Sequence, residues 1–321
     1  MGVQILYSVK DSTVVMSSGS NCYEWQILDR IKETHNVFTY VLDPVSDSQR
    51  FSFEVGQFVM LGTFLKRPTA SGNSEESFVE RAYSISSSPL RRHLELTIKD
   101  EKPYGYINPK TGKADGFAPY FFEQMKTGDK ISLKFGIRKE HFMSKITNGT
   151  EKNIAYWSGS NGAEPARCLI QYMEDIKDSE YNLTLFYSNP TLYFPDDNSI
   201  NVIYYNWLID MARKMDKFNL VFTFTKDQDL PDSEHPRVKY RKGRFFLNQD
   251  YSEEKTLSKY HAKVDNCFNP ICGSSAFING TVKLPDGRIR RGKGIKQDLM
   301  EIEGIKSEKL DIEQFYLQHV N

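Results

Sequence analysis

The chain has 321 residues, of which 39% are hydrophobic and 26% are charged, with 42 basic and 42 acidic side chains and a formal net charge of zero. The length favours two domains over one, and the composition is ordinary for a globular protein with a hydrophobic core. The balanced charge argues against bulk electrostatic binding to nucleic acid or to an anionic membrane surface, and it leaves a local charged patch open.

The sequence contains no apolar run that approaches the roughly 20 residues needed to span a bilayer. Residues 1–7 have neither the charged start nor the long apolar stretch of a secretory signal, so we expect a cytoplasmic protein without membrane insertion. The four cysteines and six histidines are scattered and show no paired-ligand spacing. We therefore expect neither a metal site nor an intrinsic iron–sulfur cluster.

Residues 1–148 are expected to form an antiparallel β-barrel. Short runs rich in β-branched and aromatic residues occur at 23–28, 37–42 and 57–61, and turn residues separate them. Further strands are expected at 94–99 and 130–136. This spacing indicates consecutive antiparallel strands rather than alternating strands and helices.

The strand that ends in Arg81-Ala82-Tyr83-Ser84 carries a candidate binding motif. Side chains alternate in extended backbone, so Arg81 and Tyr83 share one face. A permanent cation beside a flat aromatic ring suits a ligand that carries both phosphate and a planar ring, and Ser84 adds a hydroxyl at the ring edge. The alternative is that the four residues occur by chance in an ordinary strand.

Residues 149–321 change to alternating strands and helices, which predicts a parallel sheet covered on both faces. A strand at 153–157 leads into the small-residue turn Gly159-Ser160-Asn161-Gly162 and then a helix. Such a turn lets a phosphate approach backbone N–H groups at the helix start. The alternative is a plain strand–helix junction, where Gly and Ser are common.

A third strand is expected at 219–226, and its end carries Thr225 and Lys226, with Arg244 further downstream. A hydroxyl with several cations suits a dianionic phosphate, and a solvated basic loop is the alternative. The helix expected around 204–215 has an apolar stripe that indicates core packing.

Taken in order, these segments resemble the ferredoxin–NADP reductase family over about residues 23–316. Arg81–Ser84 resembles the family's Arg-x-Tyr-Ser flavin motif, and 159–165 resembles its nicotinamide-nucleotide loop. Residues 268–277 resemble its Cys-Gly turn, and 304–316 its closing segment. The resemblance implies bound FAD, with Arg81 on the pyrophosphate, Tyr83 packed on the isoalloxazine and Ser84 near flavin N5.

The resemblance also implies roles for residues near the nicotinamide. Cys272 and Gly273 would lie against that ring, with a buried structural cysteine as the alternative. Glu313 would lie near the contact between the two rings, with Phe315 or Tyr316 beside the flavin.

A helix that starts near residue 119 would direct its N-terminus, with Gly116 and Ala118, at the flavin pyrophosphate. Pro119 stands where the family has Ser or Thr, which removes one phosphate contact. Thr225-Lys226 and Gly243-Arg244 favour NADPH over NADH, although NADH-using relatives also carry a Gly-Arg there.

The implied function is that of an FAD-dependent reductase that passes hydride from NAD(P)H to flavin and single electrons to a carrier such as ferredoxin. One alternative is the electron-input subunit of a larger redox complex of the hydrogenase or oxygenase type. Another is a non-catalytic nucleotide-binding module. The cationic segment 284–294 is an insertion relative to the family, either a solvated hairpin or a docking site for an acidic electron carrier.

Overall fold

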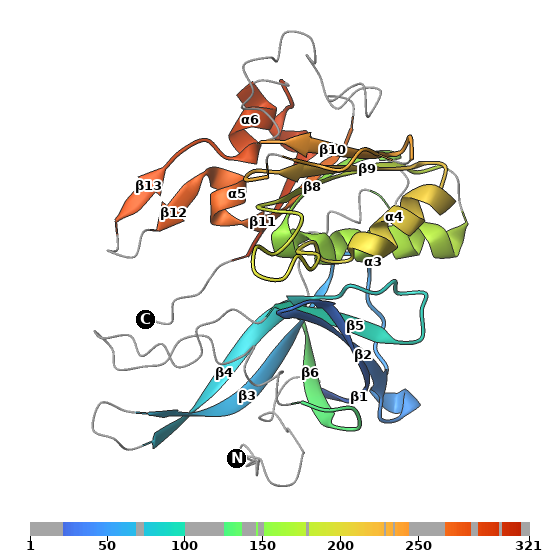
Figure 1. Cartoon of the computed structure of the whole chain (residues 1–321). Coiled ribbons are helices and arrows are strands. Elements are labelled where there is room, and N and C mark those ends of the chain that lie inside the picture. Colours follow the sequence, from blue (N-terminus) through green and yellow to red (C-terminus); the bar gives the residue numbers. More distant parts are fainter. Residues whose placement is uncertain are drawn as a thin grey trace. The chain divides into compact units, whose positions relative to one another are not determined.

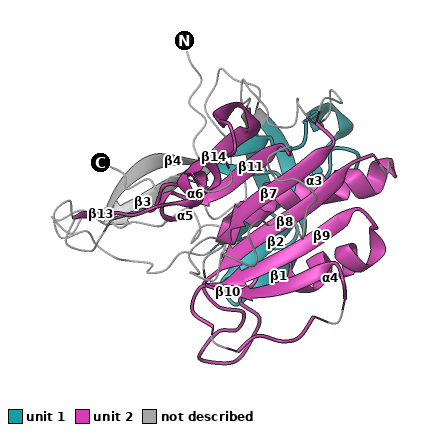
Figure 2. Cartoon of the chain, turned by 90° about the horizontal axis from the view of Figure 1, so that it is seen from above, with its two compact units in different colours: residues 1–139, 318–321 teal, residues 140–317 magenta. Residues whose placement is uncertain are grey.

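The computed structural model describes residues 22–68, 74–99, 125–136, 146, 151–177, 180–227, 229–233, 235–243, 267–283, 288–301 and 304–315. The chain divides into two compact units, one of residues 1–139 with 318–321 and one of residues 140–317 (Figure 2). The domain boundary expected at 148/149 stays a prediction.

The first unit is a six-stranded antiparallel sheet (Figure 1). Its strands are β1 (Cys22–Thr34), β2 (Val37–Pro44), β3 (Phe58–Pro68), β4 (Ser74–Ser84), β5 (Leu94–Lys99) and β6 (Lys130–Gly136), in the order β4-β3-β6-β1-β2-β5. A bridge between Ile85 and Leu96 joins the continuation of β4 to β5, the two edge strands. The sheet therefore closes on itself, and the predicted barrel is confirmed.

The barrel interior follows from the two-residue period of its strands. In β2 the buried and partly buried positions alternate along most of the strand, and Leu42 is fully buried. Trp25, Ile27 and Leu133 contribute to the same core. The buried hydroxyls of Thr39 and Thr97 pair across β2 and β5 at 2.8 Å, which satisfies both polar groups inside the barrel. A short 3-10 turn, η2 (Asp47–Gln49), follows β2.

The second unit is a six-stranded parallel sheet, as the alternating pattern predicts. Its strands are β7 (Asn153–Gly159), β8 (Asn182–Asn189), β9 (Phe218–Phe224), β10 (Val238–Lys242), β11 (Asn269–Ser274) and β14 (Leu310–Phe315), in the order β10-β9-β8-β7-β11-β14. Six of the seven β7 residues are buried, as expected for a strand covered on both faces.

Helices cover both faces of this sheet (Figure 1). They are α3 (Ala163–Ile176), α4 (Tyr205–Lys214), α5 (Ser275–Asn279) and α6 (Ile295–Glu301). Val221 packs with Ile278 of α5 and Leu299 of α6, whereas the ring of the next residue, Phe222, lies 5.4 Å from that of Tyr205 in α4. Adjacent residues of one strand thus face opposite helix layers.

The expected core helix is confirmed as α4, in which Leu208, Met211 and Ala212 are buried. A feature that the sequence did not indicate lies beside it. The guanidinium of Arg167 in α3 is 4.9 Å from the ring centre of Tyr204 and 5.2 Å from that of Trp207. The two helices are therefore joined partly by a largely buried cation–π cluster.

The insertion at 284–294 belongs to a two-stranded antiparallel hairpin. Its first strand, β12 (Thr281–Lys283), directly precedes the insertion, and its second, β13 (Ile289–Arg291), lies within the insertion and is fully exposed. The base of this hairpin requires glycine at position 280 for two reasons. The backbone there has a φ of +66°, and a Cβ would lie 2.4 Å from the carbonyl oxygen of Gly292. A 3-10 turn, η6 (Ser307–Lys309), precedes β14.

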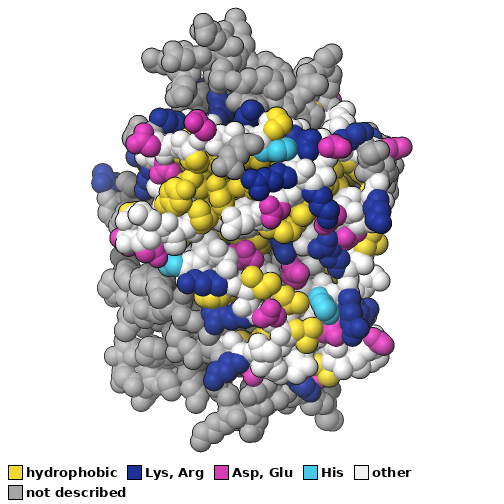
Figure 3. Space-filling view, turned by 45° about the vertical axis from the view of Figure 1, so that its right-hand side comes forward, with side chains coloured by type: hydrophobic (Ala, Val, Ile, Leu, Met, Phe, Trp, Pro, Cys, Tyr) yellow, Lys and Arg dark blue, Asp and Glu magenta, His cyan; other side chains and the backbone are white. Residues whose placement is uncertain are grey.

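Cationic and anionic side chains are interspersed among the coloured residues on the face in Figure 3, in keeping with the zero net charge. None of the helices within the described ranges combines the length and hydropathy that a bilayer-spanning helix requires.

A buried hydrogen-bond network between β7 and β11 gives a stability prediction. The Trp157 indole donates to Asn269 Oδ1 at 3.0 Å, and Asn269 Nδ2 donates to the Cys267 carbonyl at 2.7 Å. Asn269→Ala removes both bonds in a fully buried setting, so we expect the free energy of unfolding to fall by about 2 kcal/mol. Denaturant unfolding of Asn182→Ala, which removes an exposed Asn–Asn bond, is the matched control and should differ little from wild type.

Candidate functional site

The first candidate cluster lies at the end of β4, where the barrel closes. The β3–β4 register places Tyr83 beside Val59 and Ser84 beside Phe58. Ser84 is 2% exposed, and Tyr83 is partly buried against the barrel core. The strand expected at 57–61 and the Arg81–Ser84 motif thus lie side by side. Arg81 lies in the same strand, β4, where its backbone pairs with Leu61 of β3.

Three serines that follow Ser84 hold this end of β4 in place. Ser86 donates its hydroxyl to the Glu95 carbonyl at 3.0 Å, and the Glu95 N–H donates to Ser87 Oγ at 2.9 Å. The Leu90 N–H donates to Ser88 Oγ at 3.2 Å, and all three serines are fully buried. These hydroxyls complete the seam between β4 and β5, a role that the run of serines alone does not indicate.

The second cluster lies where the strand order of the parallel sheet reverses. From β7 the chain proceeds through β8, β9 and β10 on one side, whereas β11 and β14 lie on the other. In open parallel sheets, ligands bind at the carboxyl ends of the strands at this switch point. The turn η3 (Ser160–Gly162) leaves β7 there and leads directly into α3.

The predicted turn is packed against β11 so closely that it requires glycine. A Cβ on Gly162 would lie 2.0 Å from the carbonyl oxygen of Cys272, and one on Gly159 would lie 2.6 Å from the Phe277 ring. Ser160 adopts a left-handed φ of +52°, and Asn161 completes the turn. The backbone of the turn therefore forms a tight, small-residue cradle at the switch point.

Strand register brings the remaining predicted residues of the second unit to the same edge. Cys272, which is 1% exposed, lies between Ser158 of β7 and Glu313 of β14, and Ser274 pairs with Phe315. Gly273 packs against the Phe277 ring. Glu313 and Phe315 are placed by their backbone pairing in β14. Segments more than 100 residues apart thus meet beside the glycine turn.

Thr225 and Lys226 lie at the same sheet edge, two strands away from β7, and both are exposed. Their N–H groups donate to the carbonyls of Asn189 and Pro190 at 3.2 and 2.9 Å. The amide of Asn189, which is 5% exposed, donates to two carbonyls of the β8–α4 connection and so fixes it. A buried amide of this kind was not predicted from the sequence.

Several predicted residues lie outside the described part of the chain. These are Gly116, Ala118, Arg244 and Tyr316, together with Pro119. Among the described residues, no group of His, Cys, Asp and Glu side chains is arranged to hold a metal ion. Within the same ranges, the Ser158 hydroxyl, next to Cys272 in register, is buried without a hydrogen-bond partner.

No protein-family model and no curated relative matches the sequence. Solved structures do match. A ferredoxin NADP+ reductase from Neisseria gonorrhoeae with bound FAD and NADP has a TM-score of 0.58 at 16% identity, covering 93% of this chain and 100% of that one. The cytochrome b5 reductase domain of Ulva prolifera nitrate reductase has a TM-score of 0.52 at 19% identity, covering 78% and 86%.

A flavohemoglobin from Malassezia yamatoensis with bound FAD and heme has a TM-score of 0.58 at 15% identity. The match covers 92% of this chain and 60% of the longer flavohemoglobin. The protein therefore has the fold of ferredoxin–NADP+ reductases and related reductase domains: an antiparallel barrel followed by a Rossmann-like parallel sheet.

Proposed function

We propose that the protein is a flavin-dependent NAD(P)H reductase, with residues 1–148 as the FAD-binding domain and 149–321 as the NAD(P)-binding domain. The observation that carries this proposal is the glycine turn packed on Cys272 at the switch point, in a chain whose barrel has Arg81, Tyr83 and Ser84 at its closing seam. The cytoplasm is the expected location.

The residues at the barrel seam fit a flavin nucleotide. Arg81 would hold the pyrophosphate, Tyr83 would pack on the ring system and Ser84 would present its hydroxyl at the ring edge. Gly116 and Ala118 would contribute backbone N–H groups, and Phe315 or Tyr316 would cover the ring. When bound, FAD supplies hydride acceptance and single-electron release, while the protein positions the reactants and excludes water.

The switch point of the second unit fits a nicotinamide dinucleotide. The turn Gly159–Gly162 lies at the start of α3, where the positive end of the helix dipole would favour the pyrophosphate anion. Cys272 and Gly273 would form the surface beside the nicotinamide, with Glu313 next to them.

Single electrons would pass to a carrier protein such as ferredoxin. The rival in the same chemical class is the electron-input subunit of a larger redox complex, which co-purifying subunits would reveal.

A reconstitution experiment tests the flavin site. FAD added to the purified apoprotein should bind at one equivalent, and quenching of FAD fluorescence gives the dissociation constant. Arg81→Ala should weaken binding roughly 10- to 100-fold, because it removes a charge-assisted contact. Arg213→Ala, an exposed arginine in α4, is the control. Failure of the wild-type protein to bind FAD would favour a non-catalytic binding module.

The preference for NADPH is testable at the end of β9. Lys226→Ala should raise the KM for NADPH roughly tenfold and change the KM for NADH little, because only NADPH carries the 2′-phosphate that Lys226, Thr225 and Arg244 would hold. Lys217→Ala, at the opposite end of the same strand, is the matched control. Equal effects on both nucleotides would argue against this assignment.

A further inference from the structure

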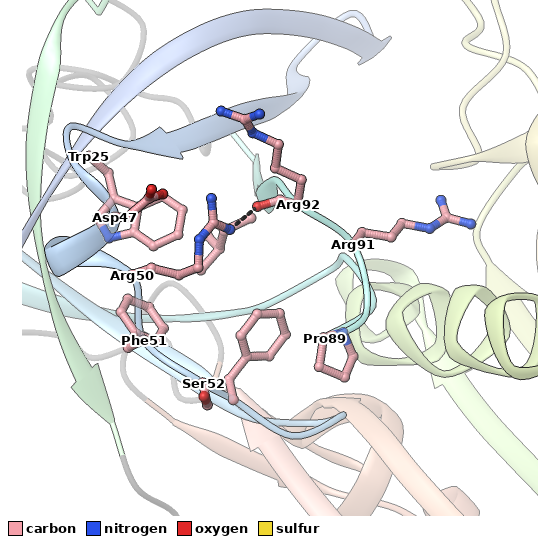
Figure 4. A pocket seen from close by; sticks show the side chains of 10 residues that line it. Trp25, Asp47, Arg50, Phe51, Ser52, Pro89, Arg91 and Arg92 are labelled. Carbon is pink, nitrogen blue, oxygen red and sulfur yellow. Dashed lines mark hydrogen bonds between the residues drawn. The ribbon is translucent and has the colours of Figure 1, made fainter.

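A cavity of about 320 Å³ lies in the first unit, between the segment 47–53 that precedes β3 and the segment 89–94 that precedes β5 (Figure 4). Tyr83 and Ser84, two described residues proposed for flavin, do not line it. Its volume is at the lower end of the range for small-molecule sites. Among the described residues, the lining of the cavity is therefore separate from Tyr83 and Ser84.

Aromatic and aliphatic side chains form the apolar wall of the cavity. The Phe51 ring lies 5.3 Å from Trp25 and 6.4 Å from Phe53, in tilted and edge-on arrangements. Leu94, which is 1% exposed, and Pro89 also line the cavity. Such walls accept a flat apolar group through stacking and edge contacts.

The charged lining of the cavity is predominantly cationic. Three arginines, Arg50, Arg91 and Arg92, line it against one aspartate, Asp47. The side chains of Arg91 and Arg92 extend away from the cavity, whereas Arg50 lies between the two segments (Figure 4). Arg50 is therefore the cation placed to contact a ligand, and the other two add positive potential around it.

Arg50 is held in position by groups that only partly neutralise it. Its NH1 donates to the Arg92 carbonyl at 2.7 Å, and its NH2 lies 3.6 Å from Asp43. Asp43 is shared, because Arg92 contacts it at 3.1 Å and the His93 ring lies 3.9 Å away. The Asp43 carboxylate is thus shared by two guanidiniums. Counted with Asp47 of the lining, it leaves the three arginines one formal positive charge in excess among the described residues.

We propose that this cavity binds a small planar aromatic anion of the aryl carboxylate class. The ring lies between Phe51, Phe53 and Pro89, and the carboxylate accepts hydrogen bonds from Arg50. The planar guanidinium of arginine matches the two oxygens of a carboxylate. Tyr83 and Ser84 do not line the cavity, so we expect the ligand to bind with FAD in place.

The test is an NMR titration of the FAD-loaded, full-length protein with 1-naphthoate, with neutral 1-naphthamide as the isosteric comparison. The indole N–H of Trp25 is a local reporter, since it has no hydrogen-bond partner among the described residues, and Trp25→Phe assigns its cross-peak. We expect a saturable shift with 1-naphthoate and at least tenfold weaker binding of 1-naphthamide. Arg50→Gln should weaken 1-naphthoate binding roughly tenfold, and Arg50→Lys should weaken it less.

Arg213→Gln removes one exposed arginine from the second unit and should leave the affinity unchanged. The absence of a saturable Trp25 shift would overturn the proposal, as would equal binding of the acid and the amide. Competition between 1-naphthoate and FAD would also overturn it, because the cavity would then belong to the flavin site. The comparison of 1-naphthoate with 1-naphthamide uses the wild-type protein. It therefore tests whether the cavity prefers the anion even if the Arg50 variants fold poorly.

Discussion

Replacing Gly162 by alanine is expected to lower the free energy of unfolding of the second unit by about 3 kcal/mol. The added Cβ would lie 2.0 Å from the carbonyl oxygen and 2.6 Å from the carbonyl carbon of Cys272. Both atoms belong to the backbone of β11, so no flexible side chain can move aside. Relief requires the turn and β11 to separate, which disturbs the packing at the switch point.

Denaturant unfolding measures this effect, and Gly292→Ala is the matched control. A Cβ at Gly292 would have the carbonyl oxygen of Gly280 at 3.5 Å as its nearest neighbour, an ordinary contact, so a change within about 0.5 kcal/mol is expected. Gly162→Ala should also weaken nucleotide binding, because the same backbone forms the proposed pyrophosphate cradle. A stability equal to that of Gly292→Ala would show that the turn and β11 are less tightly packed than described here.

Replacing Ser84 by alanine is expected to slow reduction of bound FAD on the order of 100-fold while FAD stays bound. The hydroxyl would lie at the reacting edge of the ring system, and loss of one preorganised donor has an effect of this size. Ser84 is 2% exposed, and the seam formed by Ser86 and Ser87 fixes its place on β4. We therefore expect Ser84 to affect the reaction more than flavin affinity.

Anaerobic stopped-flow absorbance after mixing with NADPH measures this rate constant, and FAD content is determined on the same sample. Ser48→Ala, at an exposed position in η2, serves as the control and should behave as wild type. An unchanged rate in Ser84→Ala would remove this residue from the catalytic assignment. A loss of FAD would instead give Ser84 a binding role.

The sequence predicts the elements of this fold well because their patterns are local. The run of β-branched and aromatic residues at 37–42 and the helix expected after the turn at 159–162 depend on neighbours in the chain, and the structure confirms both elements as β2 and α3. The small-residue turn at 159–162 is also a local signal, and it lies at a strand–helix junction as expected. The fold class follows from the order in which such elements occur.

Pairing between distant strands was not predictable from these local patterns. The register that places Cys272 beside Glu313 depends on which strands become neighbours, and the bridge from Ile85 to Leu96 depends on closure of the whole barrel. The contact of Arg50 with the Arg92 carbonyl joins two loops 42 residues apart. For this reason the sequence indicated neither the serine seam nor the cavity.

We propose that one chain binds FAD and receives hydride from a nicotinamide nucleotide. The most direct measurement is the visible spectrum of the FAD-loaded protein without oxygen, recorded before and after addition of NADPH or NADH. We expect yellow-flavin absorbance bands that bleach on addition, faster with NADPH. A protein that binds FAD but keeps these bands with both nucleotides would contradict the proposed reductase activity.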